Sequence, residues 1–237
     1  MTKYGVFDGT AYAVGGTTPI HDGSSIEIEV IASFDDATLG GQTIGAKVDD
    51  AGTREFILYK ASVPSPYYMQ AYLYNAAGTL HQINFAENLE NGEYFHSKLI
   101  YADGVATTYN MKTGEVIDTI TLSDLRLVPN SKTLISTYET TGAGEMAGKV
   151  AYCKMGEAEF KFDDDYGTTT IVNTGTAGGD ATLTGATLAS FWQTDYSGLK
   201  DVKNGYGKFD GAVRIEGSTS DIHDGTLHIS AIAKKNL

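Results

Sequence analysis

Alternation of apolar and polar residues runs through most of this 237-residue chain. In residues 25–34 every second residue from Ile26 is apolar, and Glu27 and Glu29 fall between the apolar positions. Successive side chains of a β-strand point to opposite faces, so this pattern predicts a half-buried strand. Residues 157–162 repeat the pattern and predict a second strand of the same kind.

Other segments show the same alternation and are expected to be strands: 43–48, 54–60, 67–74, 79–85, 95–102, 105–110, 115–122, 132–138, 148–155, 209–215 and 226–233. Turn signals such as Asn91-Gly92 and Asp103-Gly104 separate them. No stretch of the length of a helix shows a helical apolar stripe. Short strands at spacings of about 8–12 residues predict an all-β fold, an antiparallel β-sandwich or barrel.

Composition divides the chain into three parts. Residues 1–162 carry most of the predicted strands and are expected to form the body of a sandwich. Residues 163–207 are rich in Gly and Thr, yet apolar residues keep recurring in them. We therefore expect this part to cross the surface and complete the sandwich. Residues 208–237 form a third part, because they repeat the start of the chain.

The repeat matches residues 6–33 to residues 208–235 without gaps. Nine pairs are identical: Phe7/Phe209, Asp8/Asp210, Gly9/Gly211, Gly15/Gly217, Thr17/Thr219, Ile20/Ile222, His21/His223, Asp22/Asp224 and Gly23/Gly225. The apolar rhythm of the following strand also survives. The second copy looks like the opening of a sandwich whose remainder is missing, so it must dock elsewhere to bury its apolar face.

Two kinds of docking remain open for residues 208–235. The first and last strands of one sandwich can lie side by side, or the second copy can add to the sheet of a neighbouring subunit. For the second arrangement the predicted subunit contacts are Phe209, Val213, Ile215, Leu227 and Ile229.

Charge narrows the classes of partner. The chain has 30 acidic and 17 basic residues and a formal charge of −13. This balance argues against nucleic acid and against anionic membrane surfaces, which bind clustered Lys and Arg. A single cysteine excludes an internal disulfide framework and a cysteine-rich zinc site. We also expect no membrane span and no signal peptide, because neither pattern is visible.

Several motifs resemble a known superfamily in their order. They are FDGTAYAV (7–14), GEYFHSKLIYAD (92–103), YNMKTGEVI (109–117), EFKFDDDYGTTTIVNTG (159–175) and ATLTGATLASFW (181–192). Together they resemble the concanavalin A-like lectin/glucanase superfamily, in its laminin-G-like branch. The resemblance implies a jelly-roll sandwich. There are two departures: residues 159–175 follow the first FDG strand instead of preceding it, and Tyr94 stands where the family has Trp.

The passage ending in Phe191-Trp192 also resembles small laminin-G-like domains of tailed-phage virion proteins. Together with the acidity and the missing disulfides, this resemblance implies a structural or decoration protein of a phage virion, assembled in the host cytoplasm. Such a protein would act through contacts with copies of itself or with other virion subunits. The alternative is a carbohydrate-binding or adhesion module, on a virion or a cell surface.

No catalytic activity is predicted. Glucanases of this superfamily carry an E-x-D-x-x-E strand, which sets two carboxylates on one face. Here Ile28 stands between Glu27 and Glu29, so alternating Glu on a solvated strand face is the simpler interpretation. Cys153 lies in a predicted buried strand, and no histidine has a catalytic pattern around it. His21, in its I-H-D-G turn, is expected to bond to the turn backbone.

Two kinds of ligand are considered. Related sandwiches hold Ca²⁺ in loops with Asp and Asn, which makes Ca²⁺ the one candidate cofactor, at Asp163, Asp164, Asp165 and Asn173; the simpler interpretation of the Asp run is a solvated strand end. A sugar would need an aromatic platform, and Trp192, Tyr67 and Tyr68 are the candidates, although a lone Trp after a strand is also typical of a core.

Overall fold

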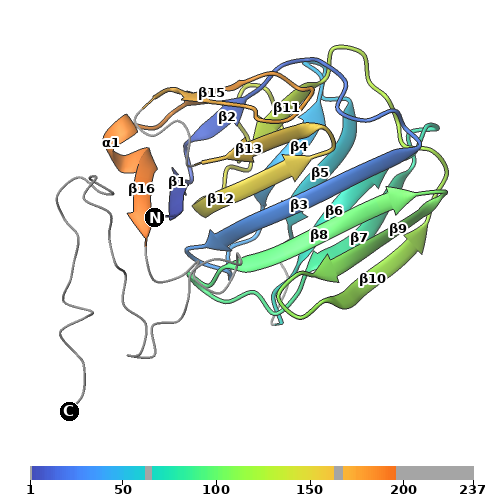
Figure 1. Cartoon of the computed structure of the whole chain (residues 1–237), viewed down its shortest axis with the longest axis horizontal. Coiled ribbons are helices and arrows are strands. Elements are labelled where there is room, and N and C mark those ends of the chain that lie inside the picture. Colours follow the sequence, from blue (N-terminus) through green and yellow to red (C-terminus); the bar gives the residue numbers. More distant parts are fainter. Residues whose placement is uncertain (1, 62–65, 163–167, 196–237) are drawn as a thin grey trace, which may run out of the picture.

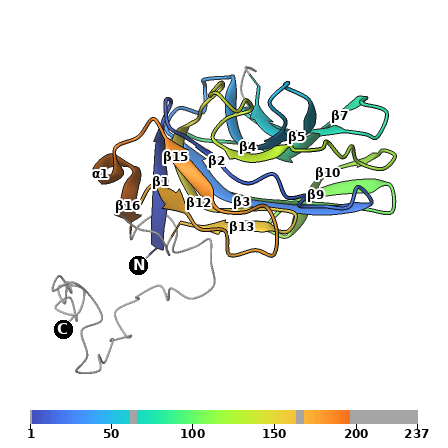
Figure 2. The ribbon, with the colours of Figure 1, turned by 90° about the horizontal axis from the view of Figure 1, so that it is seen from above.

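The computed structural model describes residues 2–61, 66–162 and 168–195, which form two antiparallel sheets packed face to face (Figure 1). Figure 2 shows the two layers from above. The predicted all-β antiparallel sandwich is confirmed. Within the described ranges, the helix α1 (Leu188–Phe191) has four residues, and no helix is long and apolar enough to cross a membrane.

The first sheet has eight strands in the order β10-β9-β8-β3-β12-β1-β16, with β13 paired to β12. Their bounds are β1 (Thr2–Asp8), β3 (Ser25–Phe34), β8 (Phe95–Ala102), β9 (Val105–Asn110), β10 (Glu115–Thr121), β12 (Ala147–Met155), β13 (Ala158–Lys161) and β16 (Trp192–Asp195).

The second sheet also has eight strands, in the order β14-β15-β2-β11-β4-β5-β6-β7. Their bounds are β2 (Tyr12–Val14), β4 (Gln42–Val48), β5 (Arg54–Lys60), β6 (Met69–Tyr74), β7 (Leu80–Ala86), β11 (Lys132–Ile135), β14 (Thr170–Ile171) and β15 (Ala181–Thr184). The sequence predicted β3 to β13 within a few residues but not the short strands that close the sheets.

The hydrophobic core lies between the sheets. From the first sheet, Ile28 and Val30 of β3 are buried in it, and from the second sheet Phe56 and Leu58 of β5. Each fully buried side chain of this size contributes roughly 1.5–3 kcal/mol relative to an exposed one. The alternation corresponds to burial from Ser25 to Val30, with Glu27 on the outer face, whereas Val30–Phe34 are buried on both faces of the sheet.

The last described segment closes both sheets against the start of the chain. β15 pairs with β2 in the second sheet, and β16 pairs with β1 in the first. Phe7 and Phe191 meet edge to face with ring centroids 5.0 Å apart. A Cβ at Gly5 would lie 2.5 Å from Phe191, so glycine is required at this position for the rings to pack on β1.

The first copy of the repeat supplies the end of β1, all of β2 and nearly all of β3, and it fits a tight slot. The side chains of Ala11 and Ala13 are fully buried. A Cβ at Gly16 would lie 2.6 Å from the backbone oxygen of Gly178. The slot is thus shaped for very small residues.

The second copy lies outside the described residues, and with it the predicted subunit contacts Phe209, Val213, Ile215, Leu227 and Ile229. Neither way of docking that the sequence leaves open is tested.

The structure of the first copy changes one detail of the repeat. In β3 the core residues begin with Ile26 and Ile28, whereas Ser25 is exposed and Glu27 half-exposed. The ungapped alignment sets Leu227 and Ile229 opposite Ser25 and Glu27. In the ungapped alignment, apolar residues of the second copy therefore fall opposite the outward positions of β3. A gap of one residue in the second copy, at the turn before this strand, would align the apolar positions of the two copies, because a shift of one residue moves every side chain to the other face.

Candidate functional site

A hollow of about 390 Å³ lies on the outer face of the second sheet. Strands β5, β6 and β7 and the segment after β11 contribute its lining, which consists of Arg54, Ile57, Tyr59, Tyr72, Tyr74, Leu80 and Tyr138. We call this surface the tyrosine hollow. Four of its seven lining residues are tyrosines, and none is Asp or Glu.

The floor of the tyrosine hollow is apolar. A separate cluster of buried side chains lies on the outer side of this sheet, formed by Ala46, Val48, Ile57 and Leu134. Ile57 alternates with Phe56 and Leu58, which belong to the core between the sheets. Tyr59, Tyr72 and Tyr138 pack against this cluster and cover it partly. The outer face is therefore an apolar base with amphipathic rings around it.

The tyrosine rings contact one another at angles. The centroids of Tyr59 and Tyr72 are 5.4 Å apart with planes tilted by 45°, and those of Tyr59 and Tyr138 are 6.4 Å apart, edge to face. Burial raises the pKa of Tyr72, and the neighbouring phenols of Tyr59, Tyr68 and Tyr74 raise it further. The Tyr72 hydroxyl therefore keeps its proton at neutral pH and can donate a hydrogen bond.

A β-bulge turns Arg54 toward the tyrosine hollow. Lys47 of β4 pairs with Phe56 of β5, but the next residue, Val48, pairs with Arg54. Glu55 is thus an extra residue in β5. A bulge redirects the side chains beyond it, which is why Arg54 and Ile57 line the same hollow although they are three residues apart.

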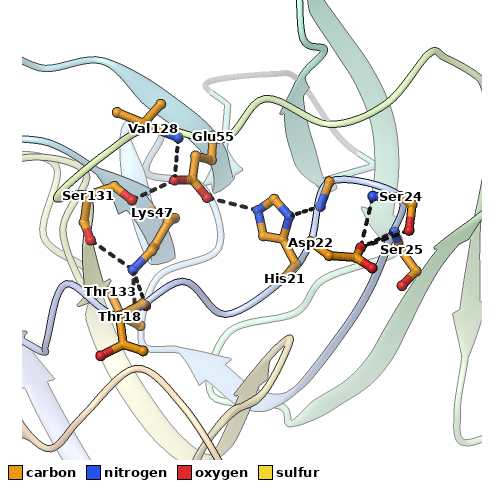
Figure 3. Close-up of polar contacts among 11 residues, drawn as sticks. Thr18, His21, Asp22, Ser24, Ser25, Lys47, Glu55, Val128, Ser131 and Thr133 are labelled. Carbon is orange, nitrogen blue, oxygen red and sulfur yellow. Dashed lines mark hydrogen bonds and ion pairs between the residues drawn. The ribbon is translucent and has the colours of Figure 1, made fainter.

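The bulged residue Glu55 is held by a buried polar network (Figure 3). Its carboxylate accepts hydrogen bonds from the Ser131 hydroxyl at 2.5 Å and the Val128 amide at 2.9 Å, and it lies 2.8 Å from Nε2 of His21. Burial alone would raise the pKa of Glu55, but the hydrogen bonds from His21, Ser131 and Val128 outweigh it and lower the pKa below its usual value.

His21 links this network to its own turn. Nδ1 of His21 accepts the amide N–H of Gly23 at 3.1 Å, as the I-H-D-G motif predicted. The proton is therefore placed on Nε2, which donates to Glu55. The bond to the turn is confirmed; the bond to Glu55 was not visible in the sequence, because Glu55 lies 34 residues further along the chain.

Lys47 joins the opposite side of the network. Its ammonium group donates to the backbone oxygens of Ser131 and Thr18, at 2.8 and 3.1 Å, and lies 3.4 Å from the hydroxyl of Thr133. Burial lowers the pKa of Lys47 to about 8, and the charge of Glu55 opposes this shift. The network fixes the ends of β4 and β5, and so the position of the bulge that carries Arg54.

Tyr138 stands on a tightly built segment after β11. The Thr137 hydroxyl accepts the amides of Glu139 and Ala143, at 3.2 and 2.9 Å. Gly144 has a φ of +64°, and a Cβ there would lie 2.3 Å from the Tyr138 ring. Glycine is therefore required at position 144 for Tyr138 to reach the tyrosine hollow.

Arg54 is the charged group of the tyrosine hollow. Its Cζ lies 5.3 Å from the centroid of the Tyr138 ring, within the range of a cation–π contact. Its Nε is buried and has no hydrogen-bond partner among the residues that the structure describes. In contrast, Lys98 and Lys154 pair with Glu27 at 2.9 and 2.7 Å.

Trp192 does not form an exposed platform. Its side chain is 1% exposed and packs against Phe191 with ring centroids 4.9 Å apart. Its indole N–H donates to the backbone oxygen of Thr168 at 2.8 Å. The prediction of a sugar platform at Trp192 is wrong, because the aromatic cluster of Phe162 and Phe191 draws this side chain into the core.

Tyr67 and Tyr68 are both half-buried, but they face different surroundings. Tyr67 packs on the core between the sheets, with Lys60 Nζ 5.4 Å from its ring centroid. Tyr68 is close enough for its phenol to raise the pKa of Tyr72. Of the two predicted aromatics, Tyr68 is therefore the one near the tyrosine hollow, although it does not line it.

The calcium candidates are only partly described. Asp163, Asp164 and Asp165 lie outside the described residues. The side-chain oxygen of Asn173 accepts the amides of Glu159 and Gly175, at 2.9 and 2.8 Å. Two N–H donors at this oxygen leave it unsuited to a cation, so Asn173 is not a ligand. No metal-binding cluster of His, Cys, Asp and Glu occurs among the residues described.

The other candidates have structural surroundings. Glu29 pairs with His96 at 2.7 Å, and Glu27 with two lysines, so the alternating Glu residues form ion pairs on the outer face of the first sheet. Cys153 is fully buried, as predicted, and burial raises its pKa to about 12. A thiol with that pKa is a poor nucleophile near neutral pH.

Sequence reasoning missed the lining of the tyrosine hollow. One signal was present, since Gln70, Tyr72 and Tyr74 fall on the outward positions of β6 and the last two are aromatic. Tyr59 and Tyr138 gave no such signal, because their place depends on strand pairing and on the loop after β11.

Comparison with known proteins gives the fold a context. The sequence matches no family model and no curated protein. A putative carbohydrate-binding protein from Bacteroides ovatus aligns with a TM-score of 0.57 and 17% identity, over 82% of this chain and 60% of that one. A heptameric SAP-like pentraxin from Limulus polyphemus aligns with a TM-score of 0.52 and 14% identity, over 65% and 75%. The fold is that of a lectin-like jelly roll.

A further alignment, to domains LG4-5 of the mouse laminin α1 chain, has a TM-score of 0.49 and 8% identity, over 65% of this chain and 41% of that one. At these identities the similarity concerns the fold alone. The alignments to the Bacteroides ovatus protein and the Limulus pentraxin confirm the jelly roll that the resemblance to the concanavalin A-like superfamily implied, as a fold alone.

Proposed function

We propose that this jelly roll is a non-enzymatic glycan-binding module and that the tyrosine hollow is its binding site. The observation that carries the proposal is the set of half-buried tyrosines over an apolar floor on the outer face of the second sheet. Support from the fold comes from the Bacteroides ovatus protein, which is itself described as a putative carbohydrate-binding protein.

The chemistry of the tyrosine hollow suits a sugar. A pyranose has an apolar C–H face and a rim of hydroxyls, so it matches a ring that is apolar on its face and polar at its tip. The hollow of about 390 Å³ falls within the roughly 300–1,000 Å³ typical of small-ligand sites. The Tyr72 hydroxyl and the Arg54 guanidinium supply donors beside the apolar floor.

The lining also supports binding without hydrolysis. Glycoside hydrolysis uses a pair of carboxyl groups on either side of the bond that breaks. The lining residues include no Asp and no Glu. A bound sugar would thus meet rings and donors, but no acid or nucleophile of that kind.

A glycan array followed by titration calorimetry tests the proposal with the full chain. Tyr59→Ala should weaken binding of the best glycan at least about ten-fold, because it removes the ring that contacts Tyr72 and Tyr138. The matched control is Tyr109→Ala, a half-exposed tyrosine on β9 of the other sheet, which should bind like the wild type. Melting curves check that both variants fold.

Silence across a broad array, or equal loss in Tyr59→Ala and Tyr109→Ala, would overturn the proposal. The structural role in a phage virion stays a prediction from the sequence. Its expected subunit contacts fall in residues 208–237, outside the described part, and neither the pentraxin nor the Bacteroides protein is described as a virion protein.

A further inference from the structure

The ligand class follows from the charge of the tyrosine hollow. Resting on the proposed function, we infer that the hollow selects glycans that carry a carboxylate, with Arg54 as the residue that recognises it. Arg54 is the one charged residue of the lining, and the buried Nε of its guanidinium lacks a partner among the described residues.

A bound carboxylate would meet the guanidinium group of Arg54 where this residue lines the hollow. The guanidinium group is planar and offers parallel N–H donors that match both oxygens of a carboxylate. A neutral sugar hydroxyl would satisfy one donor at most and would leave the charge unmatched. The Tyr138 ring, with its centroid 5.3 Å from Cζ of Arg54, packs beside the half-buried arginine.

The surroundings of Arg54 favour an anion in spite of the acidic chain. The net charge of −13 repels anions at long range. Inside the hollow, however, no lining residue is acidic, so a carboxylate there meets Arg54 and neutral tyrosines. On the other outer face, Lys98 and Lys154 are already paired with Glu27.

The second requirement, an apolar platform, is met at the same place. Arg54 and Tyr59 both belong to β5, and Tyr59 contacts Tyr72 on the neighbouring strand. A pyranose ring lying on these tyrosines can direct its carboxylate toward Arg54. The shared chemistry is a carboxylated pyranose; a uronic acid and a sialic acid are the two sources.

The experiment compares matched glycans by calorimetry with the full chain. One arm uses hexuronate oligosaccharides and their carboxyl-reduced neutral counterparts, and the other uses sialylated glycans and their methyl esters. At least one carboxylated series should bind about ten-fold or more tightly than its neutral counterpart. Arg54→Gln should abolish that preference, and Arg54→Lys should keep part of it. The control is Arg126→Gln, a half-exposed arginine outside the hollow.

The outcomes separate this inference from the proposed function. If neutral glycans bind in a way that Tyr59→Ala abolishes, and the carboxylate or Arg54 makes no difference, the inference is wrong and the proposed function stands. If no glycan binds, both fail. If Arg54→Gln and Arg126→Gln lose the preference equally, the selectivity reflects overall charge and the role of Arg54 is wrong.

Discussion

The two outer faces of the sandwich use their polar residues in opposite ways. On the first sheet, Glu27 and Glu29 are matched by Lys98, Lys154 and His96 at 2.7–2.9 Å. On the second sheet, tyrosines surround an apolar floor, and no lining carboxylate matches Arg54.

This difference indicates on which face a ligand can gain binding free energy. Exposed ion pairs are already satisfied and hydrated, and each contributes at most about 1 kcal/mol. Apolar surface beside an unmatched donor can gain both burial and hydrogen bonds on binding. We therefore call the outer face of the second sheet, around the tyrosine hollow, the receptive face, and the surface around Glu27 the paired face.

The largest effect is expected from Gly144→Val, which disturbs the receptive face without replacing any of the lining residues. The φ of +64° and a Cβ contact of 2.8 Å with the backbone oxygen of Gly41 leave no room for a side chain. We expect a loss of about 2–4 kcal/mol in the free energy of unfolding, and weaker glycan binding, because Tyr138 is displaced. Urea unfolding and calorimetry measure the two effects.

The control for Gly144→Val is Gly114→Val, in the hairpin between β9 and β10. Gly114 has a similar φ of +78° but no atom within 4 Å of a built Cβ. It should lose stability through backbone strain alone, about 1–3 kcal/mol, and bind glycans normally. Equal glycan affinity in the two variants would show that Tyr138 is not part of the site.

A smaller effect is expected on the stability of the protein at acid pH, through Glu55. The pKa of Glu55 is lower in the folded protein than its usual 4.5, so its stabilisation is complete above that pH and is lost as the pH falls through the folded pKa. Glu55→Gln should lower the free energy of unfolding by about 1–3 kcal/mol at pH 7. It should also make that free energy fall less steeply as the pH is lowered, which we call flattening the acid limb. Unfolding measured between pH 2 and 7 checks both.

The comparison for Glu55→Gln is Glu27→Gln on the paired face. Burial would raise the pKa of Glu27, but Lys154 and Lys98 outweigh it and lower the pKa. Because Glu27 is partly exposed, its variant should flatten the acid limb less than Glu55→Gln does. A larger change in Glu27→Gln would contradict the central position we give to the buried network.

The smallest effect is expected from Lys154→Gln. Removing one of the two lysines beside Glu27 should change the free energy of unfolding by about 1 kcal/mol or less, because Lys98 remains paired with that carboxylate. Glycan affinity should not change. If it falls in the same assay that follows Tyr59→Ala, the receptive face has been assigned to the wrong sheet.

The sequence predicted the fold well because alternation is a local property. Residues 25–34 matched β3 in full, since burial on one face leaves a period of two. The site depended on features that leave no such trace. The bulge at Glu55 has no pattern of residue types that would reveal it in the sequence. The contact between Tyr138 and Tyr59 depends on how the loop after β11 folds back onto the sheet.

Trp192 shows the opposite error, since a residue type suggested a site where packing made a core. Its motif gave its place in the sequence order but not its side of the sheet. The partners that bury it come from distant segments, and Phe162 is 30 residues away. Residue type alone therefore misplaced the platform, whereas the outward aromatics Tyr72 and Tyr74 of β6 were already visible in the alternation.

The narrow slot of the first repeat copy has a consequence for folding. In a chain with two similar segments, the second copy could occupy the position of the first. The later copy has Ser218 where Gly16 passes Gly178, and Val213 and Ile215 where two buried alanines lie. Each such enlargement costs about 1–3 kcal/mol in a packed core. Larger side chains at these three positions would therefore disfavour the second copy in the slot of the first.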